Sequence, residues 1–159
     1  MLAVKTETRW NEAVVKRFRA AAATDGVEVG YREEERYPDG ESVCAVALAQ
    51  EFGTPKIPPR PWIRPTLDSR KGHWARMIAT ALKTTAKTEA GVRNMWRDRG
   101  KAIVANLQHG IDKANDPHLS AHTIARRLAR GNSSVKPLVD TGKMRNGLSF
   151  RVAGEEWAS

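Results

Sequence analysis

The stretch Glu51–Leu67 reads EFGTPKIPPRPWIRPTL, and it contains five of the eight prolines in the chain. Each proline fixes its own φ near about −65° and disfavours the helical region for the residue before it. We therefore predict a stiff, extended arm over residues 53–65 that joins neither a helix nor an inner strand. Gly53, at the start of this arm, suits a sharp backbone turn.

The arm combines apolar side chains with cations, which are Ile57, Trp62, Ile63, Lys56, Arg60 and Arg64. A stiff segment with spaced anchors loses little conformational entropy on docking, so one interpretation is an interface with another molecule. The other interpretation is a rigid loop that covers the protein's own core. The residues of the arm alone leave both interpretations open.

Two blocks of sequence resemble a known family of proteins. The first is Glu51–Thr54 followed by Pro59–Pro65, and the second is Pro137–Phe150, in which Asp140-Thr141-Gly142 leads into a basic step and a strand-like run. This combination resembles the neck and tail-completion proteins of long-tailed bacteriophages, which are also described as virion morphogenesis or minor tail proteins. The blocks cover about a fifth of the chain, and they are more specific together than either is alone.

The resemblance implies a structural virion protein of the phage neck that acts in tail completion and head–tail joining. Because phage necks are rings, it implies several copies that contact one another and the neighbouring head–tail connector or tail terminator proteins. It also implies synthesis in the host cytoplasm and residence in the virion, with no enzymatic activity and no membrane. Non-specific contact with packaged DNA is compatible with this role.

The two blocks are expected to supply the intermolecular contacts. Our hypothesis is that Trp62 and Ile63 fill an apolar site on the adjacent subunit or the tail terminator. Arg60 and Arg64 would pair with carboxylates of the same partner. The candidate interface residues are Phe52, Gly53, Arg60, Trp62, Ile63, Arg64, Asp140, Thr141, Gly142 and Arg145.

The apolar periodicity predicts a single α+β domain over residues 1–159, in which a small antiparallel sheet packs with an N-terminal helix and a central helical section. Helical spacing covers residues 6–23 and 66–111. The second range is either one broken helix or two packed helices, with Thr66 as a cap and a later start near Thr88. Alternation predicts strands at Val27–Tyr31 and Leu148–Val152. Residues 42–52 suit either a strand or a short helix.

Turn and linker signals separate these elements. Pro38-Asp39-Gly40 indicates an exposed turn, and a hydrophobic staple around Ser120 indicates a short helix that ends near residue 130. We expect Arg126 and Arg127 to complement the dipole at the C-terminal end of that helix. Residues 131–136 read as a flexible linker, and residues 154–159 read as a loose tail.

Charge is distributed unevenly along the chain, whose formal net charge is +9. Residues 1–53 carry 7 Lys and Arg against 10 Asp and Glu, whereas residues 54–159 carry 20 against 8. A basic body suggests an anionic partner, either DNA or an acidic protein surface, and the acidic first third also suits self-association. The alternative function is therefore a basic DNA-binding accessory protein, whose affinity would fall steeply with salt.

No constellation of residues in the sequence predicts catalysis, a cofactor or a metal site. Asp140-Thr141-Gly142 matches the triplet of aspartic proteases, but those enzymes use two such triplets, and the cations Lys143 and Arg145 oppose a shared proton. We favour a structural interpretation, in which Asp140 or Thr141 caps a turn and Gly142 supplies an unusual φ. The four histidines lack the spacing of zinc ligands. The single cysteine, Cys44, fits a small buried hydrophobe made in a reducing compartment.

Overall fold

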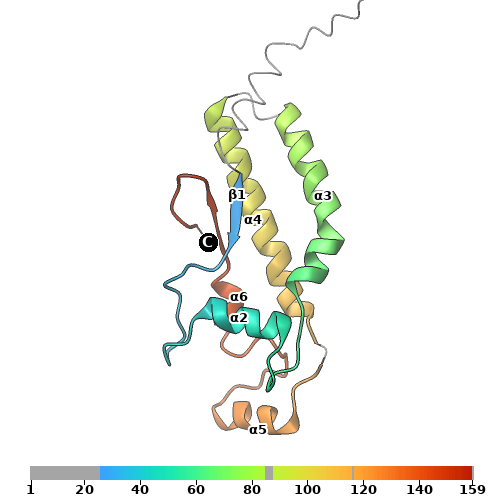
Figure 1. Ribbon diagram of the computed structural model, residues 1–159, viewed down its shortest axis with the longest axis vertical. Helices are drawn as coiled ribbons and strands as arrows, with labels where there is room; N and C mark the ends of the chain where they lie inside the picture. The colour runs from blue at the N-terminus through green and yellow to red at the C-terminus, as the bar shows by residue number, and fades with distance from the viewer. Residues whose placement is uncertain (1–25, 85–87, 116, 159) are drawn as a thin grey trace, which may run out of the picture.

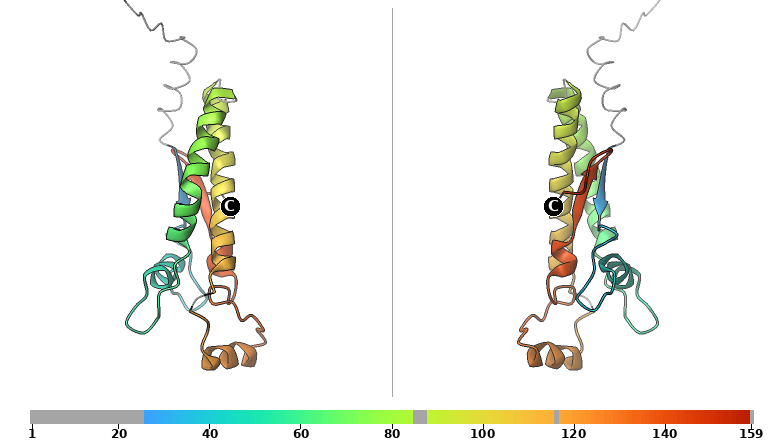
Figure 2. Two further views of the ribbon diagram at one scale, coloured as in Figure 1. Left: turned by 90° about the vertical axis from the view of Figure 1, so that its right-hand side faces the viewer. Right: turned by 90° about the vertical axis from the view of Figure 1, so that its left-hand side faces the viewer.

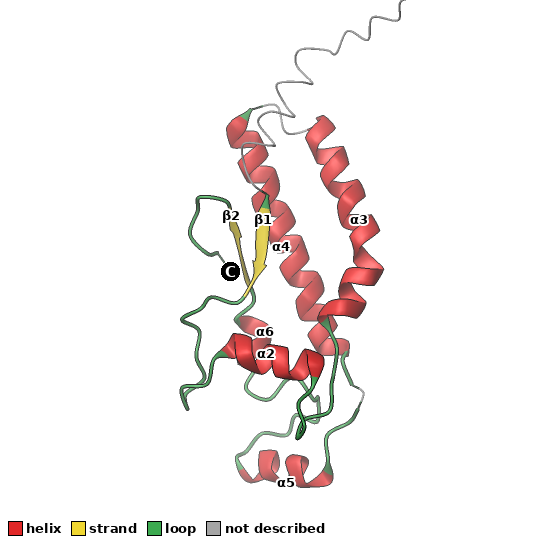
Figure 3. Cartoon of the chain, in the orientation of Figure 1, coloured by secondary structure: helices red, strands yellow, loops and turns green. Residues whose placement is uncertain are grey.

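The computed structural model describes residues 26–84, 88–115 and 117–158, so the helix expected over residues 6–23 lies outside the described residues. The described elements, in chain order, are β1 (Val27–Gly30), α2 (Val43–Phe52), α3 (Ile63–Thr84), α4 (Glu89–Lys113), α5 (Ala121–Ala129), α6 (Lys143–Asn146) and β2 (Ser149–Val152). The predicted α+β class is confirmed (Figure 1, Figure 3).

The two longest helices, α3 and α4, form an antiparallel hairpin along the long axis of the molecule (Figure 1). The second begins after the N-cap Thr88, whose side chain accepts a hydrogen bond from the N–H of Gly91 at 3.0 Å. Of the two arrangements left open for residues 66–111, the structure thus shows two packed helices. None of the helices among the described residues is long and apolar enough to cross a membrane.

The strands β1 and β2 form a two-stranded antiparallel sheet, in which Val27 pairs with Val152 and Val29 with Phe150. Both predicted strands are therefore confirmed to within one residue. The sheet packs along α4 (Figure 1), and Gly100 of α4 lies against the ring of Phe150 in β2. A Cβ at this position would lie 2.3 Å from Cδ2 of Phe150, so the packing requires glycine there.

The main core lies where α4 meets the sheet, α2 and α6. Its buried members come from α4, from α2 and from both of the sequence blocks described above: Val43, Ala47, Trp62, Val104, Leu107, Ile111, Leu138, Met144, Leu148 and Phe150. A second, smaller cluster of Ala81, Val92 and Met95 holds the other end of the helical hairpin. Burial of this apolar surface is the main favourable term in folding.

Residues 42–52, for which strand and helix both remained open, form α2. Ser42 caps the helix by accepting a hydrogen bond from the N–H of Ala45 at 3.4 Å, and Gly53 ends it at φ 77°. The helix lies across the lower end of the sheet, close to α6 (Figure 1). Its three alanines favour helix over strand.

The proline-rich arm is shorter than predicted, because α3 begins at Ile63 and not after Pro65. Ile63, Arg64 and Pro65 form the first turn of the helix. A proline is tolerated there because the N–H groups of a first turn have no partner within the helix. Thr66 consequently lies inside the helix and does not cap it; its Oγ1 donates a hydrogen bond to the carbonyl of Trp62 at 2.7 Å.

The C-terminal segment, which was expected to be loose, is packed against the sheet. Ala158 exchanges two backbone hydrogen bonds of 2.7 Å with Phe150. The guanidinium of Arg151 lies 5.1 Å from the ring centroid of Trp157, and Glu155 pairs with Arg97 at 2.7 Å. The tail thereby adds contacts to both β2 and α4.

Candidate functional site

The first sequence block is organised around the carboxylate of Glu51, which is only 1% exposed at the end of α2. One of its oxygens accepts the N–H groups of Trp62 and Ile63 at 2.7 and 2.9 Å. The other accepts the N–H and the Nε of Arg64 at 3.1 and 2.9 Å. Glu51 therefore caps the N-terminus of α3 from a different helix, where a negative charge complements the helix dipole.

The protonation of Glu51 follows from these contacts. Burial by itself would raise the pKa of this carboxyl group, because it disfavours the charged form. The N–H donors of Ile63, Trp62 and Arg64, with the Arg64 side chain, act in the opposite direction and together lower the pKa below the ordinary value of glutamate. Glu51 is thus held as a carboxylate that joins α2 to α3.

Arg60 is the second fixed point of the block, and its side chain is buried. Its Nε donates a hydrogen bond to the carbonyl of Pro117 at 2.8 Å, and its Nη2 donates to the carbonyl of His118 at 3.4 Å. Burial, and then the nearby cation of Arg127, lower the pKa of Arg60. The expectation that this guanidinium pairs with carboxylates of a partner is corrected, because its donors bind the chain that leads into α5.

Trp62 lies in the protein's own core and is 2% exposed. Its ring meets that of Tyr31 edge to face, with 6.5 Å between the centroids, and Ile63 is half-buried against the same core. The expectation that Trp62 inserts into a neighbouring subunit is therefore corrected. Two interpretations were left open for the arm. Residues 60–63 fit the second one, a rigid loop that covers the protein's own core.

Among the candidate interface residues of the first block, Phe52 and Arg64 are exposed. Phe52 is 62% exposed, and the guanidinium of Arg64 lies 4.9 Å from the centroid of its ring. Ala45, Leu48 and Phe52 are all exposed and share the side of α2 that faces away from the core, and Leu67 is exposed one turn after Arg64 on α3. We call Ala45, Leu48, Phe52, Arg64 and Leu67 the docking face.

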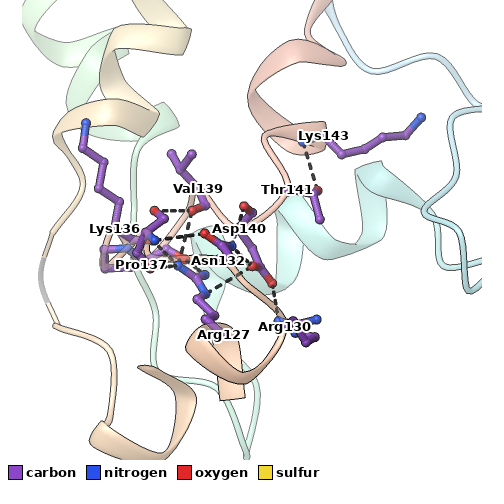
Figure 4. A network of polar contacts seen from close by, with 10 residues as sticks. Arg127, Arg130, Asn132, Lys136, Pro137, Val139, Asp140, Thr141 and Lys143 are labelled. Atoms are coloured by element: carbon purple, nitrogen blue, oxygen red, sulfur yellow. Dashed lines mark hydrogen bonds and ion pairs between the residues drawn. The ribbon is translucent and has the colours of Figure 1, made fainter. Parts of the chain in front are cut away.

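The second block forms a tight turn before α6 (Figure 4). Gly142 has φ 76°, and the Oγ1 of Thr141 accepts the N–H of Lys143 at 3.2 Å. These contacts agree with the structural interpretation of Asp140-Thr141-Gly142. Asp140 accepts a hydrogen bond from the side chain of Asn132 at 2.6 Å and pairs with Arg130 at 3.1 Å. Its carboxylate therefore closes the loop after α5.

Arg145, the last candidate of the second block, is bound within the protein. Its Nε lies 2.9 and 3.0 Å from the two carboxylate oxygens of Asp112 on α4. This pair fixes α6 against the long helix. Within the described residues, the two blocks thus hold the fold together, and Phe52 and Arg64 are the candidates that form part of an exposed apolar face.

Arg127 is a buried residue that the sequence did not reveal. It was expected to complement a helix dipole, but its guanidinium donates instead to a set of backbone carbonyls, which belong to Ser134, Lys136, Pro137 and Val139 (Figure 4). The segment expected as a linker, residues 131–136, therefore wraps around a buried cation. No pattern in the sequence distinguishes Arg127 from its neighbour Arg126.

A cavity of about 430 Å³ lies between α2, the Tyr37–Glu41 turn, the end of α5 and the second block. We call it the lower cavity. Its walls include the apolar side chains of Val46, Leu138 and Met144, and the carboxylates of Asp39 and Glu41 lie at the same cavity. Arg127, Arg130, Asp140 and Lys143 also line the cavity, so charged groups of both signs lie beside its apolar surface.

Two shallower hollows between α3 and α4 carry basic residues. One is lined by His73, Arg76 and Arg99 among others, and the second by Arg70, His109 and Lys113 among others. No acidic residue lines either hollow. We call these six residues the basic face.

The described residues contain no group of three or more His, Cys, Asp or Glu placed to hold a metal ion. Cys44 is half-buried and free. Comparisons with protein-family models, with curated proteins and with solved structures found nothing that matches this chain.

Proposed function

We propose that this chain is a structural protein of a bacteriophage neck, which acts in tail completion and head–tail joining as one subunit of a ring. The proposal starts from the resemblance of the Glu51–Pro65 and Pro137–Phe150 blocks to neck and tail-completion proteins. Its partners are other copies of the chain and the adjacent connector or tail terminator proteins.

The docking face is the observation that carries the proposal. Ala45, Leu48 and Phe52 recur along α2 at helical spacing, and all three are exposed, so an apolar stripe faces away from the protein's own core. Contiguous exposed apolar surface marks sites of interaction with other proteins more often than isolated apolar residues do. Such a face suits a protein that contacts other subunits in an assembly.

The buried contacts of the first block support the same function. Glu51 fixes α2 to the start of α3, and Arg64 is held both by Glu51 and against the ring of Phe52. The docking face is therefore presented by two helices in a fixed relation. A preorganised surface loses little entropy on association.

The experiment that tests the neck role is electron microscopy of particles from a phage that carries this gene, after the gene is interrupted. We expect full heads separate from free tails, or tails with faulty ends. Normal, infectious virions would overturn the proposal.

Substitution of Phe52 by serine tests the docking face. We expect Phe52→Ser to weaken self-association of the purified chain by roughly tenfold or more, because an exposed aromatic anchor is lost while the core is untouched. Sedimentation over a range of concentrations measures the effect. Leu128→Ser is the matched control, since Leu128 is 57% exposed on α5, outside the docking face. Equal effects of the two substitutions would contradict the assignment.

A second candidate function, a DNA-binding accessory protein, is favoured by the basic face. Arg70, Arg76 and Lys113 are exposed and line hollows that have no acidic residue. Cations in such a groove neutralise phosphates and release counterions.

Duplex DNA binding at several salt concentrations separates the two functions. For a neck protein we expect only weak, non-specific binding at a physiological ionic strength of about 0.15 M, with a further loss in the triple variant Arg70→Ala, Arg76→Ala, Lys113→Ala. Tight binding at that ionic strength, abolished by the triple variant, would instead favour the accessory protein. Lys101→Ala, an exposed cation of α4 outside both hollows, is the control.

A further inference from the structure

We propose that the turn Thr54–Ile57 of one copy of this chain inserts into the lower cavity of a second copy, where Lys56 pairs with Asp39 and Glu41. The inference rests on the proposed ring, because it names the contact between neighbouring subunits. We call residues 54–57 the proline turn.

The proline turn is preorganised for insertion. The N–H of Thr54 donates to the carbonyl of Ile57 at 2.8 Å, and the N–H of Ile57 donates back at 3.2 Å. The Oγ1 of Thr54 also accepts the N–H groups of Lys56 and Ile57 at 3.3 and 3.0 Å. Pro55 fixes its own φ at the tip. A turn with its backbone groups already paired has little freedom left to lose on docking.

Gly53 fixes the position of the proline turn relative to the end of α2. Its φ is 77°, which favours glycine, and a Cβ there would lie 2.9 Å from Cδ of Pro59 and 3.0 Å from the carbonyl oxygen of Ile57. The turn therefore leaves α2 in one fixed direction. Its tip residues Pro55 and Lys56 are exposed, and Lys56 has no ion-pair partner among the described residues.

The lower cavity carries the complementary charge. Its other ionic groups are already engaged, since Asp140 pairs with both Arg130 and Arg127, at 3.1 and 3.4 Å, and Lys143 pairs with Glu35 at 3.0 Å. Asp39 accepts only the N–H of Glu41, at 3.1 Å, and neither carboxylate forms an ion pair within the part of the chain that the structure describes. Among the described lining residues, the charged groups without an ion-pair partner are therefore both carboxylates.

The pKa of Tyr37, in the wall of the cavity, is also influenced by these carboxylates. Burial raises the pKa of Tyr37, and the carboxylates of Asp140, Asp39 and Glu41 raise it further. A cation placed beside Asp39 and Glu41 would be attracted by the same carboxylates. The apolar walls at Val46, Leu138 and Met144 suit the ring of Pro55, which would be buried with the lysine stem.

The direction of the turn points to a second copy as the occupant. The loop between α2 and α3 projects sideways from the molecule, whereas α5, which borders the lower cavity, lies at its lower end (Figure 2). No residue of the proline turn is among those that line the cavity of its own chain. A contact between two different surfaces of identical subunits is heterologous, and such contacts close into rings when the rotation allows.

Charge reversal tests the pairing. We expect Lys56→Glu and Glu41→Lys each to weaken self-association of the full chain about tenfold or more, because like charges then meet in the contact. The double variant, in which the two charges are exchanged, should recover most of the loss. Lys101→Glu and Glu33→Lys are controls, as both residues are exposed and lie outside the cavity and the turn. Single variants that associate like the wild type would overturn the inference, as would a double variant without recovery.

A zero-length crosslink locates the contact directly. Unlabelled and isotopically labelled wild-type chains are mixed and treated with a carbodiimide, which joins a lysine amine to a carboxylate only when they touch. We expect peptides that join Lys56 of one isotope to Asp39 or Glu41 of the other. A ring whose crosslinks lack this pair would refute the proline-turn contact and leave the neck function standing. If this crosslink is found but virions made without the protein are normal, the neck function is refuted and the proline-turn contact stands.

Discussion

Replacement of Glu51 by alanine is expected to lower the free energy of unfolding by about 3 kcal/mol, because a hydrogen bond to a charged group contributes about 1.5 to 3 kcal/mol and this buried carboxylate accepts several. The substitution removes the acceptor of three N–H groups at the start of α3 and of the Arg64 side chain. The N–H of Trp62 is buried, so water does not replace the carboxylate there. Urea unfolding followed by Trp fluorescence measures the effect.

The same residue predicts a dependence of stability on pH. The pKa of Glu51 is lower in the folded protein than in the unfolded chain, so its contribution is fully present above the unfolded value of about 4.3. The contribution is lost as the pH falls through the folded pKa. Glu51→Gln preserves the shape and removes the charge, so we expect the difference in stability between wild type and variant to be largest at neutral pH and to shrink in acid.

Comparison of the two proteins isolates this contribution from that of other carboxylates. Hydrogen bonds from Lys143 and Arg32 lower the pKa of Glu35, for example, and that contribution is common to the wild type and the Glu51→Gln variant. Glu33→Gln, at an exposed residue, should change the stability little at any pH. A difference for Glu51→Gln that stayed constant from neutral to acid pH would contradict the role of the carboxylate.

Local signals in the sequence predicted the helix boundaries that depend on neighbouring residues. Ser120 caps α5, as the staple around it indicated, and α4 begins directly after Thr88, close to the predicted start. Gly142 takes the positive φ expected of it. Each of these features is decided within a few residues, which is the range over which capping and turn chemistry act.

The role of Glu51 was not predictable in the same way. Its carboxylate binds N–H groups 11 to 13 residues later, across a segment rich in proline, and no helical or strand periodicity connects such positions. The prediction that Trp62 inserts into a neighbouring subunit was wrong for a related reason. An aromatic residue beside arginines suits both a core and an interface, and only the path of the chain decides between them.

The burial of two arginines was also not predictable from the sequence. Backbone carbonyls accept hydrogen bonds from both buried arginines. For Arg60 the acceptor at Pro117 is 57 residues away, and for Arg127 the acceptor at Lys136 lies in the irregular loop that follows α5. Arginine is mostly exposed in proteins, so composition alone argued for surface positions. Of the three cations of the arm, Arg60 is buried, whereas Arg64 in the docking face and Lys56 in the proline turn are exposed.

Substitution of Gly100 by alanine is the second change with a large expected effect. The new Cβ would lie 2.3 Å from Cδ2 and 2.6 Å from Cγ of Phe150, whose ring is buried between α4 and the sheet. Because alanine is a better helix former than glycine by about 1 kcal/mol, the substitution by itself would stabilise the helix. Overpacking in a close-packed core costs about 1 to 3 kcal/mol and sometimes more, and here it forces the sheet away from α4. We expect a net loss of stability and a shift of β1 and β2.

Gly72→Ala separates the two effects, because it makes the same substitution in α3 without a clash. A Cβ there would meet only the end of the flexible Arg76 side chain, at 3.7 Å, so we expect a gain of up to about 1 kcal/mol. Chemical denaturation of both variants gives the difference, which reports the contact between Gly100 and Phe150. Phe150→Leu in the Gly100→Ala background should recover part of the loss, since the clashing ring atoms are gone, although Phe150→Leu alone is destabilising. If Gly100→Ala were as stable as Gly72→Ala, the sheet would not pack against α4 at this glycine.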